Sequence, residues 1–119
     1  MLTATSNVMA LTSTEINELP WEHLDGVLGV QFKALWRDPH GSSHSGLIKM
    51  LSGARITPHT HRFASHHVWV ESGSCRVGAH TFGPGAYLHV PRGVEHGIDE
   101  AGPGGCTLWY LYLSSSGLT

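Results

Sequence analysis

Alternation between apolar and polar positions predicts β-strands along most of the chain from about residue 27 onward. The clearest example runs from residue 30 to residue 36. Its apolar positions are Val30, Phe32, Ala34 and Trp36, and the residues between them are Gln31, Lys33 and Leu35. Because successive side chains of a strand point to opposite sides, this period of two predicts one buried face. Further strands are predicted at Leu47–Leu51, Val68–Glu71, Cys75–Ala79, Tyr87–Val90 and Thr107–Leu113.

Segments rich in turn-forming residues separate these strands. The sequence RDPHGSSHSG precedes Leu47, FGPG precedes Tyr87, and GPGG precedes the last strand. The sequence SGS between Glu71 and Cys75 predicts a hairpin. Fifteen glycines and six prolines in 119 residues are typical of many short strands rather than of a helical bundle. We therefore predict an all-β protein, a single-domain antiparallel jelly-roll barrel.

The predicted last strand is apolar on both faces. Leu108, Tyr110 and Tyr112 would share one face, and Trp109, Leu111 and Leu113 the other. A strand with one face in water would alternate more cleanly between apolar and polar residues. Either a second sheet of the same chain or a second subunit is therefore expected to cover the outer face.

The amino-terminal segment differs from the rest of the chain. Residues 1–19 are polar, rich in Ser and Thr, and without a sustained hydrophobic period. We predict an N-terminal arm over residues 1–19 and a barrel domain over residues 20–119. Such an arm is either mobile or ordered by lying across a partner subunit. No helix, internal repeat or second domain is predicted.

Composition excludes several classes of function. The formal net charge is −2, charged residues make up 13% of the chain, and no Lys/Arg cluster provides the basic surface that nucleic-acid binding needs. No apolar run approaches the ~18 residues of a membrane span, and the amino terminus lacks the features of a signal peptide. Cys75 and Cys106 form no Cys-x-x-Cys pair, and we expect buried, reduced thiols. These features predict a cytoplasmic protein that binds neither nucleic acid nor membranes.

Three of the four histidines between Gly53 and Gly73 are the first part of a candidate metal site. His59 and His61 are two residues apart, so both imidazoles point to one face of a strand. His66 follows a four-residue turn and can return to the same inner surface. His67 has the opposite parity, and we expect it to face outward. Imidazole is the commonest protein ligand for transition metals such as Zn, Cu, Fe and Ni.

A fourth histidine comes from a later segment. Pro91 and Gly93 build a turn that delivers His96 from a second hairpin. A lone histidine is more often structural than metal-binding, but His96 completes a set of four that could surround one ion.

The spacing of these residues resembles the two signature motifs of the cupin superfamily, over roughly residues 50–100. The matched positions are Gly53, His59, His61, His66 and Gly73 in the first motif and Gly85, Pro91, Gly93 and His96 in the second. The chain departs from the family pattern at His66, where the first motif has a glutamate, and at Glu100, where the second usually ends in an asparagine. The histidine at position 66 resembles that of the four-histidine cupins. The wider sequence resembles single-domain cupins related to anti-sigma-factor metal domains and to acetylacetone- and dihydroxyacetophenone-cleaving dioxygenases.

The resemblance implies a cofactor and two alternative functions. It implies one divalent transition metal ion per chain (Fe, Mn, Zn, Ni, Co or Cu), held by His59, His61, His66 and His96. The first function is that of an oxygenase that cleaves or oxidises a small diketone- or hydroxyketone-like substrate chelated to the metal. The alternative is a non-catalytic zinc-bound sensor or small-ligand-binding cupin. Because the sensor would be expected to carry a helical partner-binding domain, and no helix is predicted, the sequence favours the oxygenase.

Other residues are candidates to line a substrate pocket. We expect the pocket wall to include Phe63, Tyr87, His89 and Tyr110. Arg55 and Arg92 are candidates to meet an anionic substrate at the barrel mouth. Cupins commonly dimerise through an apolar sheet face, so the resemblance also implies a homodimer through the last strand.

Overall fold

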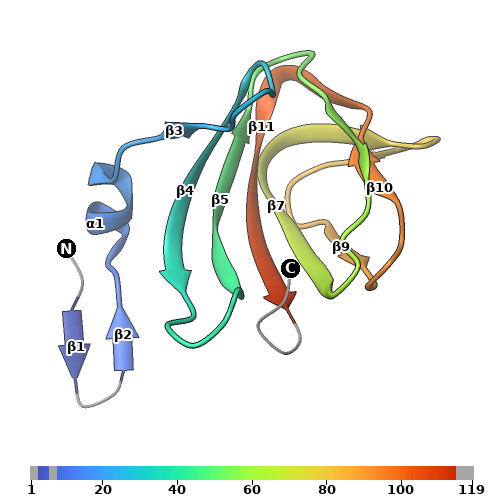
Figure 1. Cartoon of the computed structure of the whole chain (residues 1–119). Coiled ribbons are helices and arrows are strands. Elements are labelled where there is room, and N and C mark those ends of the chain that lie inside the picture. Colours follow the sequence, from blue (N-terminus) through green and yellow to red (C-terminus); the bar gives the residue numbers. More distant parts are fainter. Residues whose placement is uncertain (1–2, 6–7, 115–119) are drawn as a thin grey trace.

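The computed structural model describes residues 3–5 and 8–114 as an almost entirely antiparallel β structure (Figure 1). The first elements are β1 (Thr3–Thr5), β2 (Val8–Ala10), the helix α1 (Ser13–Glu18) and β3 (Glu22–His23). The central strands are β4 (Val30–Arg37), β5 (His44–Met50), β6 (Ile56–His59) and β7 (Ala64–Val77). The remaining strands are β8 (His80–Phe82), β9 (Tyr87–Val90), β10 (His96–Ile98) and β11 (Glu100–Ser114).

The strands form one large sheet and two small ones. The large sheet has the order β3-β4-β5-β11-β7-β8, and β9 also pairs with β7. The strands β6 and β10 pair with each other, and β1 pairs with β2. This confirms the predicted antiparallel jelly-roll fold. Among the described strands no hydrogen-bonded ladder joins the β6–β10 pair to the large sheet, so the barrel is not closed by continuous pairing.

The predicted hairpin at SGS is wrong, because residues 64–77 form the single strand β7. Gly73 has a φ of +73°, and a Cβ at this position would lie 2.0 Å from the carbonyl oxygen of Gly105. The ladder between β7 and β11 shifts register here, between Ala101 and Cys106 of β11. The glycine therefore allows a β-bulge and a close backbone approach rather than a chain reversal.

The last strand is also longer than predicted. GPGG was expected to precede it, yet β11 begins at Glu100 and continues through these residues. Gly104 and Gly105 have φ values of +84° and +83°, which places them in the irregular part of the ladder. Turn-forming residues thus interrupt the pairing without ending the strand.

The N-terminal arm contains a helix that was not predicted. In α1 the side chain of Thr12 accepts from the backbone N–H of Glu15, whose carboxylate accepts in turn from the N–H of Thr12. This capping box was visible as the pattern Thr-x-x-Glu. Lys33 of β4 donates to the carbonyl oxygen of Ile16, 3.0 Å away, and its ammonium lies over the ring of Trp21. The arm therefore contacts the outer face of its own chain.

The division into an arm at 1–19 and a barrel domain at 20–119 stays a prediction. Residues 1–2, 6–7 and 115–119 of these two parts lie outside the described residues.

The hydrophobic core lies on the inner face of the large sheet. Met50, Leu108, Val30 and Cys75 are its largest fully buried side chains. On β11, Leu108, Tyr110 and Tyr112 are buried on this face, as their shared parity predicted. On the opposite face Leu113 is 41% exposed and Trp109 and Leu111 are only partly buried. One chain therefore leaves the outer apolar face of β11 partly uncovered.

Candidate metal centre and adjoining cavity

The pair of strands β6 and β10 places two imidazoles side by side. His59 and His96 are register partners across this ladder, and their ring centroids lie 4.4 Å apart. The Nδ1 of His59 lies 2.8 Å from the carbonyl oxygen of Thr57, and the Nδ1 of His96 lies 3.0 Å from that of Val94. A carbonyl oxygen only accepts hydrogen bonds, so each Nδ1 carries the proton in the neutral ring. The Nε2 lone pair of both rings is then free to bind a metal.

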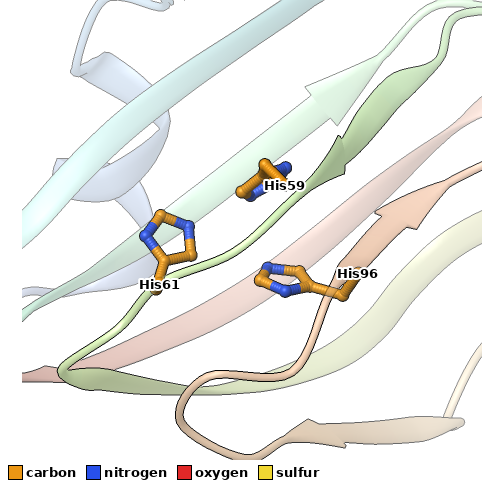
Figure 2. A group of neighbouring side chains, drawn as sticks. All are labelled: His59, His61 and His96. Carbon is orange, nitrogen blue, oxygen red and sulfur yellow. The ribbon is translucent and has the colours of Figure 1, made fainter.

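His61 completes a tight group of three. It lies two residues beyond His59, and its ring is 4.8 Å from that of His59 and 5.3 Å from that of His96. One nitrogen of each ring lies within 4.8 Å of those of the other two, so this group could hold a metal ion. Figure 2 shows the three rings gathered between the segments that carry them.

His66 of β7 lies beside this group. Its ring centroid is 4.6 Å from that of His61 and 5.0 Å from that of His96. The four histidines that the sequence singled out therefore lie near one another, but among the described residues the group of ligand atoms within 4.8 Å of one another comprises His59, His61 and His96. The assignment of His66 as a fourth ligand stays a prediction. His67, predicted to face outward, is on the opposite side of β7, where it stacks on His89.

Two buried nitrogen atoms test whether this cluster suits a metal. The Nε2 atoms of His66 and His96 are inaccessible to solvent and have no hydrogen-bond partner in the structure. Leaving a buried polar atom without a partner costs about 1–3 kcal/mol. A divalent ion between the imidazoles would satisfy such lone pairs, so the donor set fits a transition metal.

The protonation state of the cluster also suits metal binding. Burial lowers the pKa of His61, His66 and His96, and the neighbouring imidazoles lower it further. The pKa of His66 falls to about 3. These rings are therefore neutral near pH 7, and only a neutral imidazole can donate a lone pair to a metal.

A cavity of about 300 Å³ adjoins the cluster on the inner face. Its apolar wall is formed by Leu24, Val30, Phe32, Ile48 and Val68, and its polar wall by Arg37, His44, His66, Tyr110 and Tyr112. Tyr112 connects the cavity to the imidazoles, because its ring lies 4.8 Å from that of His66 and 5.3 Å from that of His61. A small molecule in this cavity would lie next to the histidine cluster.

Of the predicted pocket residues, only Tyr110 lines this cavity. Tyr87 and His89 lie on the outer face of the sheet, where both rings stack against His67. Phe63 lies in the turn before β7, and the guanidinium of Arg62 lies 5.4 Å from its ring centroid. The pairing of His67 with His89 and of Trp69 with Tyr87 explains the outward direction, because register partners share a face.

Sequence reasoning missed three polar residues of the cavity: Arg37, His44 and Tyr112. Tyr112 had been assigned to the same strand face as Tyr110, so parity alone could have included it. His44 was hidden in a segment interpreted as a loop, but it is the first residue of β5. Neither Arg55 nor Arg92 lines the cavity.

An inner-face histidine cluster on an antiparallel jelly roll, opening on a small cavity, defines a cupin. The family model described as "ChrR Cupin-like domain" matches residues 9–114, and the chain belongs to this family. No match was found among curated protein sequences. No helix in the described part of the chain is long and apolar enough to cross a membrane.

Solved structures support the same fold. KdgF from Halomonas sp. is 21% identical with a TM-score of 0.65, and the match covers 81% of this chain and 89% of that one. The polyketide cyclase RemF from Streptomyces resistomycificus is 20% identical with a TM-score of 0.71, and coverage is 87% and 79%. A chain in the complex of Rhodobacter sphaeroides SigE with the anti-sigma ChrR is 22% identical with a TM-score of 0.65. That match covers 80% of this chain but only 49% of the other. At these identities the similarity concerns the fold alone.

Proposed function

We propose that this cupin is a metal-dependent oxygenase that cleaves or oxidises a small diketone- or hydroxyketone-like substrate. His59, His61, His66 and His96 would hold one divalent transition metal ion, and the substrate would chelate it from the inner cavity. The observation that carries the proposal is the position of His66. Its unpartnered Nε2 atom belongs to the histidine cluster, and the same residue lines the cavity. The cluster is therefore open to a ligand on one side, unlike a closed structural site.

The residues of the chain have separable roles in this proposal. The carbonyl groups of Thr57 and Val94 orient the rings of His59 and His96 through Nδ1. The apolar wall of the cavity excludes water around the substrate. When bound, a divalent ion held by four neutral imidazoles would keep its full charge, act as a Lewis acid on the substrate oxygens and support reaction with dioxygen.

Metal analysis and oxygen uptake test the proposal together. Protein purified without added metal should contain about one redox-active ion per chain, and it should consume oxygen with at least one member of a diketone panel. The variant His96→Ala should lose both properties. His89→Ala, a change to a histidine of the outer face, is the matched control and should retain both. Stoichiometric zinc together with no oxygen uptake would overturn the oxygenase proposal.

A second candidate is a zinc-bound sensor or small-ligand-binding cupin. The match to the ChrR cupin-like family and the similarity to a chain of the SigE–ChrR complex favour it. The same experiment separates the two candidates, because the sensor would bind zinc and a small ligand without consuming oxygen.

We also propose that the protein is a cytoplasmic homodimer that pairs through the outer face of β11. Trp69 and Leu113 on this face are 40% and 41% exposed, and a shallow groove of about 670 Å³ lies beside Trp69 and Trp109. Burying this surface in a second copy would remove apolar area from water. Light scattering at tens of micromolar should give twice the chain mass, and a monomer would contradict the proposal.

The cytoplasmic location is supported by the two free, buried cysteines, Cys75 and Cys106, because thiols stay reduced in a reducing compartment.

A further inference from the structure

The inner cavity is lined by an arginine, Arg37. Arg37 is the last residue of β4 and pairs in register with His44, the first residue of β5. Both residues line the cavity. Within the described residues, the guanidinium of Arg37 makes no hydrogen bond or ion pair. Burial lowers the pKa of His44 and raises that of Tyr110; the positive charge of Arg37 lowers the pKa of His44 further and opposes the rise at Tyr110. The guanidinium is therefore close to two of the polar residues of the cavity wall.

The polar wall has a defined arrangement between Arg37 and the histidine cluster. The Nδ1 of His44 and the hydroxyl of Tyr110 are joined by a hydrogen bond of 2.9 Å. The ring of His44 also stacks on that of Tyr112, with centroids 4.8 Å apart and an interplanar angle of 22°. Tyr112 in turn contacts His66. Contacting rings thus lead from His44, the register partner of Arg37, through Tyr112 to the histidine cluster.

Charge balance indicates what kind of molecule this cavity accepts. None of the ten residues that line the cavity is Asp or Glu, and the adjoining cluster consists of histidines alone. A divalent ion and Arg37 would together place three positive charges around the cavity with no protein anion among these residues. Arg37 is exposed at the end of β4, so water partly screens its charge, but a cavity whose charged groups are all positive still favours an anionic ligand.

We propose that Arg37 determines specificity by binding an anionic oxygen group, such as a carboxylate, at the end of the substrate remote from its metal-chelating oxygens. This inference rests on the proposed function, since it assigns the chelating end to the histidine cluster. The substrate is then a small amphipathic anion: one end chelates, the middle contacts the apolar wall, and the far end pairs with the guanidinium. Arginine suits this role because its planar fork of N–H donors matches a carboxylate. The volume of about 300 Å³ lies at the lower end of the range for ligand pockets and limits the molecule to a short chain or a single ring.

A matched pair of probes tests this inference with the zinc-loaded, full-length chain. Heptane-2,4-dione and 4,6-dioxoheptanoate share the chelating diketone, but the second carries a carboxylate in place of the methyl group at the end of the chain remote from the diketone. We expect calorimetry to show that 4,6-dioxoheptanoate binds at least about tenfold more tightly. Arg37→Gln should abolish this preference, and Arg37→Lys should retain part of it. Arg55→Gln, at an exposed arginine outside the cavity, should leave the preference unchanged.

The outcomes separate this inference from the proposed function. An undiminished preference in Arg37→Gln, equal affinity of the two probes for the wild type, or no binding of either probe would overturn the role of Arg37. Zinc is redox-inactive, so probe binding to the zinc-loaded protein does not depend on oxygenase activity. If the anionic probe bound more tightly in an Arg37-dependent way and the metal-loaded protein consumed no oxygen, the anion site would be supported and the oxygenase rejected. Oxygen uptake with heptane-2,4-dione that is unaffected by Arg37→Gln, together with equal affinity for the two probes, would support the oxygenase and reject the anion site. Circular dichroism of Arg37→Gln and Arg37→Lys checks that both variants fold.

Discussion

The inner and outer faces of β7 and β11 are made from neighbouring residues but have different chemistry. On the inner face, His66 contacts other imidazoles and Tyr112, and its Nε2 is buried without a partner. On the outer face, the adjacent His67 shares a hydrogen bond of 2.5 Å with the hydroxyl of Tyr87 and stacks on His89. His66 thus has a buried nitrogen without a hydrogen-bond partner, whereas His67 is hydrogen-bonded to Tyr87.

This difference indicates that a ligand binds on the inner face rather than on the outer face. Both faces are rich in aromatic and histidine residues, so composition does not distinguish them. The inner face combines burial, unpartnered nitrogen atoms and an adjoining cavity, whereas the outer face presents partly exposed rings on a sheet. Unsatisfied buried polar atoms in a native protein need an explanation, and a bound ligand supplies one.

The largest expected difference between the faces is in stability. Leu108 is 1% exposed on the inner face of β11, and Leu113 is 41% exposed on the outer face. We expect Leu108→Ala to lower the free energy of unfolding by about 2–5 kcal/mol through lost burial and a new cavity. Leu113→Ala should lower it by less than about 1 kcal/mol. Denaturant unfolding at sub-micromolar protein, where association contributes little, measures both, and equal losses would refute the comparison.

The second expected effect is a loss of stability of the metal-free protein at acidic pH. Burial lowers the pKa of His66 from 6.5 to about 3, so folding favours its neutral form. The unfolded chain takes up this proton below about pH 6.5. The stabilisation is therefore complete above pH 6.5 and decreases as the pH falls from 6.5 towards 3, by a total on the order of 1–2 kcal/mol because solvent screens this partly buried ring.

Urea unfolding across this pH range checks the expectation. The variant His66→Asn should show a shallower decline in the free energy of unfolding than the wild type. The matched outer-face variant, His67→Asn, should follow the wild type. An unchanged slope in His66→Asn would show that other groups cause the acid sensitivity.

The third prediction concerns metal affinity at the same two positions. His66→Ala should weaken metal binding by roughly tenfold or more, because one nitrogen ligand is lost. His67→Ala should bind metal as the wild type does. Titration with zinc measures both, and His96→Ala provides a reference for the loss of a ligand. If His67→Ala weakened binding while His66→Ala did not, the assignment of His66 as a ligand would be wrong.

The variant His66→Glu sharpens this test. It places a carboxylate where the cupin motif has one, so metal should be retained. The added negative charge lowers the net charge of the site by one unit and makes the ion a weaker Lewis acid. Turnover of an enolisable diketone should therefore change more than metal affinity does. Loss of metal with this variant would indicate that position 66 does not face the ion.

The smallest expected effect lies on the outer face. Trp109 donates from Nε1 to the carboxylate of Glu71 over 2.7 Å, in an exposed setting. Glu71→Gln keeps the acceptor oxygen and removes the charge, so the free energy of unfolding should fall by less than about 1 kcal/mol. Thermal unfolding measures it. A loss above about 2 kcal/mol would contradict the exposed position of this hydrogen bond and would mean that the outer face is covered.

Local sequence patterns determined which faces the strands present and which histidines belong together. The parity of Leu108, Tyr110 and Tyr112 on β11 predicted the buried side correctly. On β4 the predicted alternation fails at Trp36, because a register shift after Ala34 pairs Trp36 with Ser45 on the outer face and turns Arg37 inward. The opposite directions of His66 and His67 followed from the same period of two. These features were predictable because side-chain direction in a strand depends on the backbone alone. The helix α1 was equally predictable, because its capping box from Thr12 to Glu15 is a local four-residue pattern.

Only the tertiary structure decided what surrounds the histidines. Gly73 could have formed a turn, but its contact with the backbone at Gly105 made it a bulge within a long strand. Tyr87 and His89 could have faced either way until pairing with β7 placed them outside. Arg37 and His44 flank a short hairpin far from the histidine motifs in sequence, and they reach the cavity because β4, β5 and β11 lie side by side. Register and pairing between distant strands depend on the packing of the whole core, which no local pattern encodes.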